Sequence, residues 1–314
     1  MIITCPQCAR KHNVNPDIIK VHLDSGKNIS ATCRSCKFKF PVLADQISDR
    51  SSQEPVVRKL KSRKICVTLS KGGVGKTTTS VNLGAGLALA GYKVLLVDTD
   101  TQGQSAYVLG KKPKAGLTEL LTKELTPDEC VVEARKNLWL LGGGKSLAGV
   151  KRIIDRKSFG AEWTLAEAME PLDHLYDFIL IDTSPGWDQL IVNVLFYATE
   201  VLVPVALEVM SLHGLSEFMK SLGSIQKHRK EISLKYIVPT FLDTRIKGPQ
   251  VLYSELKKLY PEYVCSPIRY SESLSDAPSF GKSIFEFAPG SIASADYRKL
   301  VRKVATNDTA LADS

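Results

Sequence analysis

A glycine-rich loop at positions 70–80, SKGGVGKTTTS, carries the residues with the clearest chemical role in this chain. In the usual phosphate-binding pattern, a glycine and four residues precede Gly-Lys-Ser/Thr, backbone N–H groups surround the phosphates and the lysine reaches the outer ones. Ser70 replaces the first glycine here, and Lys71 is a second lysine that this chemistry does not need. We expect a variant loop that binds a nucleotide through Gly72, Gly73, Val74, Gly75, Lys76, Thr77 and Thr78.

The segments on either side of the loop predict the elements that must position it. KICVTLS precedes it as a short run rich in β-branched residues, which indicates a strand. TTTSVNLGAGLALAGY follows with the apolar spacing of a helix that ends at Gly91. A strand, a glycine loop and a helix in this order are the context that a phosphate loop requires. A turn that is only rich in glycine does not require a strand before it and a helix after it, so these flanking elements favour a phosphate loop.

Three aspartates stand at or just after the ends of two other apolar runs. VLLVD ends in Asp98, with Asp100 two residues later, and FILID ends in Asp182. Because Mg²⁺ prefers oxygen ligands and keeps several waters, we expect Thr77 to bind it directly and Asp98 and Asp182 to hold its waters. Asp100 is then free to act in catalysis, with Lys76, by orienting the attacking water. Each aspartate alone is equally compatible with a helix cap, and their convergence on one loop favours the catalytic interpretation.

From Lys64 onward the chain alternates short apolar runs with helical stretches. The runs are YKVLLVDTD, NLWLLGG, DFILIDTSP, EVLVPVAL, LKYIVPTFLD and VCSPI, and helices are expected at 162–173, 188–198, 212–228 and 248–260. Continuous apolar strands separated by helices predict a doubly wound, mostly parallel α/β sheet. In such sheets ligands bind at the carboxyl ends of the strands.

Four of the seven cysteines lie in the first 36 residues as two C-x2-C pairs, Cys5 with Cys8 and Cys33 with Cys36. A segment this short cannot bury enough apolar surface to fold on its own core. Four thiolates on one Zn²⁺ supply on the order of 10 kcal/mol instead. Disulfides are disfavoured in a reducing compartment, and a thioredoxin-like redox pair needs a βαβ context that is absent here. We expect a zinc ribbon, with His12 at the surface outside the ligand set.

Composition divides the chain into four segments. We expect the zinc ribbon at 1–42, a polar linker at 43–62, the α/β P-loop ATPase domain at 63–306 and a polar tail at 307–314. Cys66, Cys130 and Cys265 each lie in or beside an apolar run, and we interpret them as packing residues.

The net charge of +9 is unevenly distributed along the chain. Residues 1–64 carry +8, residues 65–219 carry −4 and residues 220–303 carry +7. Basic segments of this kind suit a polyanion such as DNA, although a charge excess is also typical of a solvated surface. Because there is no apolar run of about 18 residues and no secretory signal pattern, we expect a cytoplasmic protein without a transmembrane segment.

The stretch SKGGVGKTTTSVNLGAGLALAGYKVLLVDTDTQGQS resembles the ParA family of partition ATPases, SIMIBI-class P-loop NTPases whose deviant Walker A loop carries an extra signature lysine. The likeness continues through LLGGGKSLAG, YDFILIDTSPG, VLVPVALEVMSLHGL, VPTFLDTR and LSDAPSFGKSI. It covers roughly residues 63–304 and leaves out the cysteine-rich segment.

This resemblance implies an ATPase that forms an ATP-dependent homodimer, binds DNA non-specifically and hydrolyses ATP when a ParB-like or other cargo adaptor stimulates it. It gives Lys71 a catalytic role, because the corresponding family residue reaches across the dimer to the partner's phosphates. It also places Pro278, within LSDAPSFGKSI, in the nucleotide site. The implied output is segregation of DNA, or positioning of another cargo, by a nucleoid-associated protein.

Two residues depart from the family pattern. Thr101 stands where the family usually has a proline after the second aspartate, and Ser273 stands where many members have an arginine associated with DNA contact. The basic cysteine-rich segment is one alternative source of that contact. A second alternative source of DNA contact consists of Arg245, Lys247, Lys257, Lys258 and Arg269.

Two other functions are compatible with the same loop. A MinD-like positioning ATPase on the membrane is expected to end in an amphipathic helix, whereas DYRKLVRKVATNDTALADS has a brief basic turn and then a polar tail. A redox carrier similar to the nitrogenase iron protein needs cluster cysteines in the ATPase body. The scattered Cys66, Cys130 and Cys265 show no such pattern.

We predict one zinc ion per chain, bound by Cys5, Cys8, Cys33 and Cys36. Elemental analysis of anaerobically purified protein is expected to find it, and the Cys33→Ser/Cys36→Ser double variant is expected to lose it, because two thiolates do not complete a tetrahedral site. A Cys130→Ala variant is the control and keeps the metal. Wild-type protein without metal, or a double variant that retains it, contradicts the site.

Overall fold

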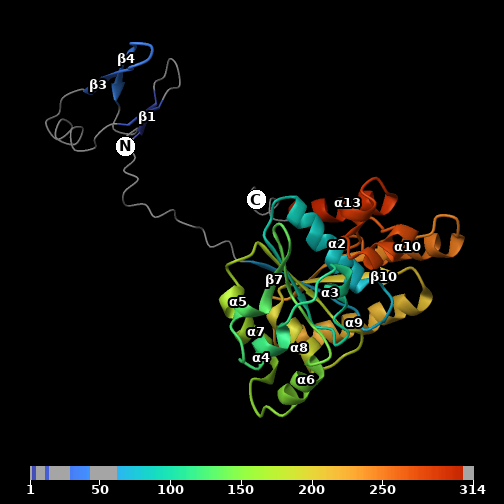
Figure 1. Cartoon of the computed structure of the whole chain (residues 1–314). Coiled ribbons are helices and arrows are strands. Elements are labelled where there is room, and N and C mark those ends of the chain that lie inside the picture. The colour runs from blue at the N-terminus through green and yellow to red at the C-terminus, as the bar shows by residue number, and fades with distance from the viewer. Residues whose placement is uncertain (1, 5–10, 14–28, 43–61, 307–314) are drawn as a thin grey trace. The chain divides into compact units, whose positions relative to one another are not determined.

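The computed structural model describes residues 2–4, 11–13, 29–42 and 62–306, which fall in two compact units, residues 1–60 and 61–314 (Figure 1). In the first unit, β1 (Ile2–Thr4) pairs antiparallel with β2 (Lys11–Asn13). A second hairpin joins β3 (Ile29–Thr32) to β4 (Lys39–Val42). Residues 43–61 of the expected linker and the tail at 307–314 lie outside the described residues.

A seven-stranded sheet forms the centre of the second unit, in the order β11-β10-β5-β9-β6-β8-β7. Six of its strands are parallel: β5 (Arg63–Val67), β6 (Val94–Asp98), β8 (Leu138–Leu141), β9 (Phe178–Asp182), β10 (Glu200–Ala206) and β11 (Ser233–Thr240). The edge strand β7 (Val131–Arg135) is antiparallel to β8. The predicted mostly parallel α/β sheet is therefore confirmed.

Helices cover both faces of this sheet (Figure 1). One face packs against α2 (Lys76–Leu89), α3 (Gln104–Val108), α12 (Ile284–Phe287) and α13 (Ile292–Thr306). The other packs against α4 (Leu117–Leu121), α6 (Leu147–Asp155), α7 (Thr164–Met169), α8 (Gln189–Tyr197), α9 (Val209–Gln226) and α10 (Lys247–Leu259). Shorter pieces are α5 (Pro127–Cys130), α11 (Glu272–Asp276) and the 3₁₀ turns η2 (Ala161–Trp163), η3 (Glu170–Leu172) and η4 (Ala277–Phe280).

No helix within these described ranges is long and apolar enough to cross a membrane. The strands have the apolar composition of elements covered on both sides, and every residue of β6 and β9 is buried. Cys66, Cys130 and Cys265 are buried too, which confirms their interpretation as packing residues.

Two features of the sheet differ from the sequence expectation. VCSPI, at positions 264–268, is not a strand, although the N–H of Cys265 and of Ile268 donate to carbonyls of β11. Isolated bridges join Val264 to Ile237 and Arg269 to Leu242, so the segment runs beside β11 without forming a continuous strand. Conversely, β7 was not predicted. Ala134 is the one fully buried residue of β7, and its neighbours Glu133 and Arg135 are charged, so a search for continuous apolar runs does not detect this strand.

Helix α2 approaches α12 and α13 more closely than an ordinary side chain permits. A Cβ atom on Gly86 would lie 2.4 Å from Cγ2 of Val301 and 3.0 Å from Cε2 of Phe285. These distances are below ordinary van der Waals contact, so the helices touch here only because Gly86 has no side chain. The helix that follows the phosphate loop is thereby fixed against the C-terminal helix.

We predict that Gly86→Ala lowers the free energy of unfolding by about 1–3 kcal/mol, because the added methyl group must displace Val301 or Phe285. Gly149→Ala is the matched control, since Gly149 lies in α6 and a Cβ added to it would meet no heavy atom within 4 Å. That variant is expected to gain about 0.5–1 kcal/mol from helix propensity. Urea denaturation measures both, and a Gly86→Ala variant as stable as wild type contradicts the close approach.

Candidate nucleotide-binding site

The glycine loop connects β5 to α2, as the sequence predicts. Gly75 caps the start of α2 with φ of 87°, and Gly73 has φ of 74°. Both values lie in the left-handed region that glycine adopts without strain. The loop therefore turns tightly over the N-terminus of α2, where free backbone N–H groups and the helix dipole favour an anion.

Polar side chains at the ends of two other strands hold the loop and the end of β5 in place. Thr183, just after β9, donates its hydroxyl to the carbonyl of Val67 at 3.0 Å. Thr240, the last residue of β11, donates its hydroxyl to the carbonyl of Val74 at 2.9 Å. Sequence analysis missed both threonines. The signal that identifies them is the one that identified the aspartates, a polar residue at the end of a buried apolar run.

Asp98 and Asp182 lie side by side and fully buried at the ends of β6 and β9. Ser105 contacts both of them: its backbone N–H donates to Oδ2 of Asp98 and its hydroxyl donates to Oδ2 of Asp182, each at 3.0 Å. Ser80 of α2 donates to Oδ1 of Asp182 at 3.1 Å. The two serines, which sequence analysis also missed, tie α2 and α3 to one carboxylate pair.

The electrostatics of this pair favour a bound cation. Burial raises the pKa of Asp98, and the neighbouring Asp182 raises it further. Burial likewise raises the pKa of Asp182, although hydrogen bonds from Thr77, Ser105 and Ser80 oppose this effect. A divalent cation close to both carboxylates relieves their repulsion, and a hydroxyl at Thr77 adds the kind of oxygen ligand that Mg²⁺ accepts. The residues present therefore fit a magnesium site.

A cavity of about 500 Å³ opens beside the loop. Its lining includes most of the predicted nucleotide contacts, namely Gly72, Gly73, Gly75, Lys76, Thr77, Thr78 and Asp100. Val74 is buried beneath the loop rather than exposed to the cavity. Pro278 borders a neighbouring cavity of about 440 Å³, whose lining it shares with Thr77 and Thr78.

The two lysines of the loop occupy different positions. Lys76 is buried, lines the cavity and donates from Nζ to the carbonyl of Lys71 at 2.8 Å. Burial lowers the pKa of Lys76, while the charges of Asp182 and Asp100 oppose this shift. The side chain of Lys71 is exposed and does not line the cavity. The structure thus brings one lysine to the cavity and leaves the other at the surface of the loop.

Several cavity residues were not predicted from sequence. Lys151 of α6 reaches the cavity and forms an ion pair with Asp188 at 2.6 Å. Phe241 follows β11 with φ of 59° and lines the same cavity as the segment 100–104. Gly143 lies so close to this segment that a Cβ on it would meet the carbonyls of Asp98 and Asp100 at 2.7 Å each. These contacts join residues that are far apart in the chain.

Half of the expected zinc ligand set lies within the described residues. Cys33 and Cys36 occupy the turn between β3 and β4, where Lys37 has φ of 60°. A backbone hydrogen bond from Cys36 is the main cause that lowers the pKa of Cys33 to about 5. Nε2 of His12 lies 3.1 Å from Sγ of Cys33, so His12 is half-buried against the turn rather than free at the surface. Cys5 and Cys8 lie outside the described residues, within which no three potential ligands gather.

Comparisons with known proteins identify the family. A protein-family model described as an AAA domain matches residues 62–235. The sporulation initiation inhibitor protein Soj of Bacillus subtilis is 37% identical over 251 residues, which cover 77% of this chain and 98% of that protein. The chromosome partitioning protein ParA of Myxococcus xanthus is 31% identical over 255 residues, covering 79% and 89%. The chain belongs to the ParA family of ATPases.

A solved structure agrees with this assignment at the level of the fold. Cobyrinic acid a,c-diamide synthase of Mycobacterium smegmatis, with bound ADP and magnesium, is 26% identical and superposes with a TM-score of 0.68. The match covers 79% of the ParA-family chain and 96% of the synthase. The resemblance drawn from the glycine loop and the acidic strand ends is therefore confirmed as a family relationship, and the α/β P-loop fold with it.

We predict that Asp98→Asn stabilises the metal-free ParA-family chain, and more at pH 7 than at pH 5. Because the pKa of Asp98 is raised above its ordinary value near 4, the folded state keeps a proton that the unfolded state has released between about pH 5 and pH 7. Wild-type stability therefore falls as pH rises, by at most about 1.4 kcal/mol per pH unit. Urea denaturation in EDTA measures this slope, which is expected to be smaller in the variant, because only Asp182 then keeps a raised pKa.

Asp243→Asn is the control for this measurement. A hydrogen bond from Arg245 lowers the pKa of Asp243 to about 2, so this group is ionised in both states above pH 5. Its replacement is expected to leave the slope between pH 5 and pH 7 unchanged. Identical slopes for wild type and Asp98→Asn contradict the raised pKa.

Proposed function

We propose that this protein is a partition or cargo-positioning ATPase, which binds ATP with Mg²⁺ in the cavity beside the glycine loop. The observation that carries the proposal is the convergence of Lys76, Thr77, Asp100 and the Asp98–Asp182 pair at one edge of the sheet. Its support from relatives is the name of the chromosome-partitioning ATPase Soj of Thermus thermophilus, which is 35% identical over 78% of this chain.

Each residue has a distinct role in the proposed reaction. The loop amides and Lys76 bind the β- and γ-phosphates, since the lysine is the buried cation within the cavity lining. Thr77 binds Mg²⁺, and Asp98 and Asp182 hold its waters. When bound, the cation neutralises charge that develops on the phosphoryl oxygens. Asp100 lines the same cavity and orients the attacking water.

Lys71 acts from a second copy of the chain in this proposal. Charge spread over the γ-phosphoryl oxygens calls for a cation on the side that the loop does not cover. The exposed side chain of Lys71 does not line the cavity of its own chain, so it is available to a partner's phosphates. An ATP-dependent homodimer with the nucleotides between its two copies is the assembly that uses it.

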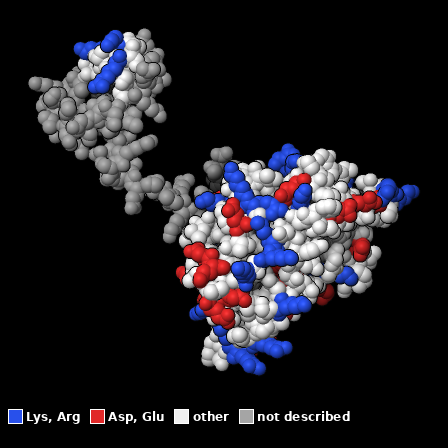
Figure 2. Space-filling model, in the orientation of Figure 1, with Lys and Arg blue, Asp and Glu red and all other residues white. Residues whose placement is uncertain are grey.

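Non-specific DNA is the proposed surface on which the dimer works, and a ParB-like or other cargo adaptor is the proposed stimulator of hydrolysis. The side chains of Lys247, Lys257 and Lys258 on α10 are exposed, whereas Arg269 forms an ion pair with the buried Asp296. Figure 2 shows a further group of basic side chains at the end of the ATPase unit where α6 lies. Phosphate contacts from such groups bind without sequence preference. The protein is then cytoplasmic and nucleoid-associated.

The amino-terminal unit is proposed to be a zinc ribbon, joined by a linker to the ATPase unit. Its support is the turn that holds Cys33 and Cys36 and the amide that stabilises the Cys33 thiolate. A ribbon that carries this positive charge is a second candidate for contact with a polyanion.

Three variants separate the steps of the proposed cycle. We predict that Lys76→Ala does not bind ATP, because the loop loses its buried cation. Asp100→Ala is expected to bind ATP and dimerise but to hydrolyse it on the order of a hundredfold more slowly, since it loses only water orientation. Lys71→Ala is expected to bind ATP as a monomer.

Calorimetry measures ATP binding, light scattering measures dimerisation and phosphate release measures hydrolysis. Retention on random-sequence duplex DNA completes the test. Wild type and Asp100→Ala are expected to bind the duplex with ATP and not with ADP. Equal binding with both nucleotides, or unchanged hydrolysis by Asp100→Ala in the presence of DNA and adaptor, contradicts the proposed function.

A further inference from the structure

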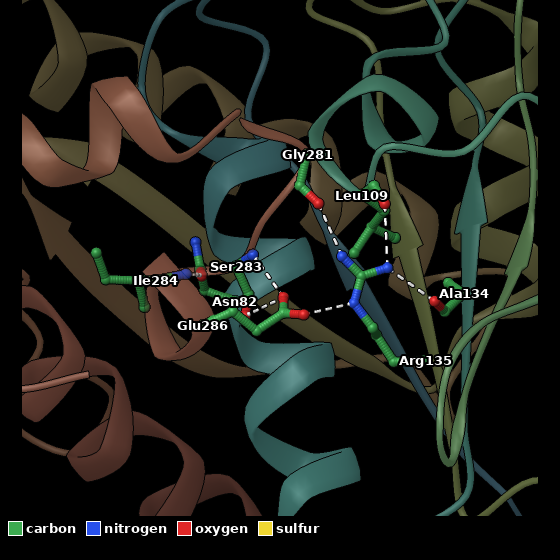
Figure 3. A network of polar contacts seen from close by, with 8 residues as sticks. All are labelled: Asn82, Leu109, Ala134, Arg135, Gly281, Ser283, Ile284 and Glu286. Carbon is green, nitrogen blue, oxygen red and sulfur yellow. Dashed lines mark hydrogen bonds and ion pairs between the residues drawn. The ribbon is translucent and has the colours of Figure 1, made fainter. Parts of the chain in front are cut away.

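One arginine outside the nucleotide site connects three segments of the ATPase unit (Figure 3). Arg135 is the last residue of β7. Its Nε donates to Oε1 of Glu286 at 2.6 Å, and its Nη2 donates to the carbonyl of Gly281 at 2.7 Å. Its Nη1 donates to the carbonyls of Leu109 at 3.1 Å and of Ala134 at 2.8 Å. A single planar guanidinium group thus links the end of α3 with the segment between η4 and α12.

The two turns that Arg135 joins are in direct backbone contact. Gly110 follows α3 with φ of 64°, and Gly281 follows η4 with φ of 62°. A Cβ on Gly281 would lie 2.7 Å from Cα of Gly110, and a Cβ on Gly110 would lie 3.2 Å from Cα of Gly281. Because no side chain separates the turns, the distance between them is set by this contact and by the hydrogen bonds of Arg135.

Both turns end elements that form walls of the neighbouring cavity, the one that Pro278 borders. α3 contributes Gln104, Tyr107 and Val108 to the cavity of about 440 Å³, and η4 contributes Pro278. Thr77 and Thr78, at the start of α2, form the side that adjoins the phosphate loop. The cavity therefore has one wall from each of the two segments that Arg135 ties together.

A second set of hydrogen bonds connects the same segment to α2. Asn82 is buried and donates from Nδ2 to the carbonyl of Thr78 at 2.8 Å. Its Oδ1 accepts the N–H of Ile284, also at 2.8 Å (Figure 3). Glu286 accepts the N–H and hydroxyl of Ser283 at 2.8 Å each. The Pro278 wall is thus anchored to α2 through Asn82 and to α3 through Arg135.

Arg135 lies away from the phosphate-binding residues. It pairs in register with Leu138, the first residue of β8, whereas Asp98 and Asp182 are the last residues of β6 and β9. Because these strands are parallel, Arg135 is at the opposite end of the sheet from the carboxylates. A change at Arg135 therefore acts on the cavity walls without removing any contact to the triphosphate.

We propose that Arg135, through its ion pair with Glu286, is a positioning residue that sets the width of a pocket for the nucleoside part of ATP. This inference rests on the proposed function, because it assumes that ATP binds at the loop. The pocket between Pro278 and α3 receives the base and ribose, and the loop holds the phosphates. The planar fork of Arg135 reaches four acceptors at once, which a lysine or glutamine side chain does not do.

The affinities of the protein for ATP and for a probe without a nucleoside test the positioning role of Arg135. Titration calorimetry with Mg²⁺ compares ATP with inorganic tripolyphosphate, which has no nucleoside. Arg135→Gln is expected to weaken ATP binding about tenfold, because the nucleoside then has to order a pocket wall that is no longer fixed. The same variant is expected to change tripolyphosphate binding less than about twofold. Arg135→Lys is expected to behave like Arg135→Gln, because the fork is lost in both.

Arg63→Gln is the matched control for a merely structural effect. Arg63 also makes several strong contacts, to Glu200 at 2.6 and 2.7 Å and to the carbonyl of Val304 at 2.5 Å, but it lines neither of the two cavities described above. This variant is expected to lower the unfolding temperature and to leave the ratio of ATP to tripolyphosphate affinity unchanged. If Arg135→Gln does not fold, Glu286→Gln removes the same ion pair at constant volume and is expected to lower the ratio as well.

The outcomes distinguish this inference from the proposed function. Wild-type protein that binds neither probe overturns the proposed function, and the inference with it. Wild type that binds ATP, together with an Arg135→Gln variant whose two affinities are unchanged or fall in parallel, overturns only the positioning role. A selective loss of ATP affinity supports it.

Discussion

The structure depends most on one electrostatic constraint, the presence of two fully buried carboxylates at the ends of adjacent strands. Burial raises the pKa of both Asp98 and Asp182, and the charge of Asp182 raises that of Asp98 further. Hydrogen bonds from Ser80 and Ser105 compensate in part, and these serines belong to α2 and α3. The helix after the phosphate loop and the segment after Asp100 are therefore held together by the group that a cation would satisfy.

A second constraint is close approach of backbone to backbone at glycines. Gly86 lets α2 touch α13, Gly143 lets its loop touch the carbonyls of Asp98 and Asp100, and Gly110 meets Gly281. Each contact joins segments distant in sequence and fixes an element that forms the site. Arg135 and Asn82 then add directional hydrogen bonds to the same elements. Glycine contacts set the distances and polar side chains set the orientations, which is how a site built from short loops keeps a defined shape.

Much of this arrangement was predictable from local pattern. The glycine loop, the helix that ends at Gly91 and the acidic ends of VLLVD and FILID identify a P-loop sheet, because each is a short signal with a direct physical cause. The edge strand β7 and the absence of a strand at 264–268 were not predictable in this way. Burial at a sheet edge is one-sided, and a short apolar run does not reveal whether it has a neighbour on each side.

The sequence by itself determined which chemistry is present, since residue types such as Lys76, Thr77 and Asp182 carry it wherever the chain places them. Tertiary structure alone decided which residues share the site. Thr183, Thr240, Phe241 and Lys151 come from three distant parts of the chain, the end of β9, the end of β11 and α6. Nothing in their local sequence shows that they lie beside the loop. The physical reason is that periodicity records which side of an element is buried. The partner across that buried side is chosen only when all strands and helices pack together.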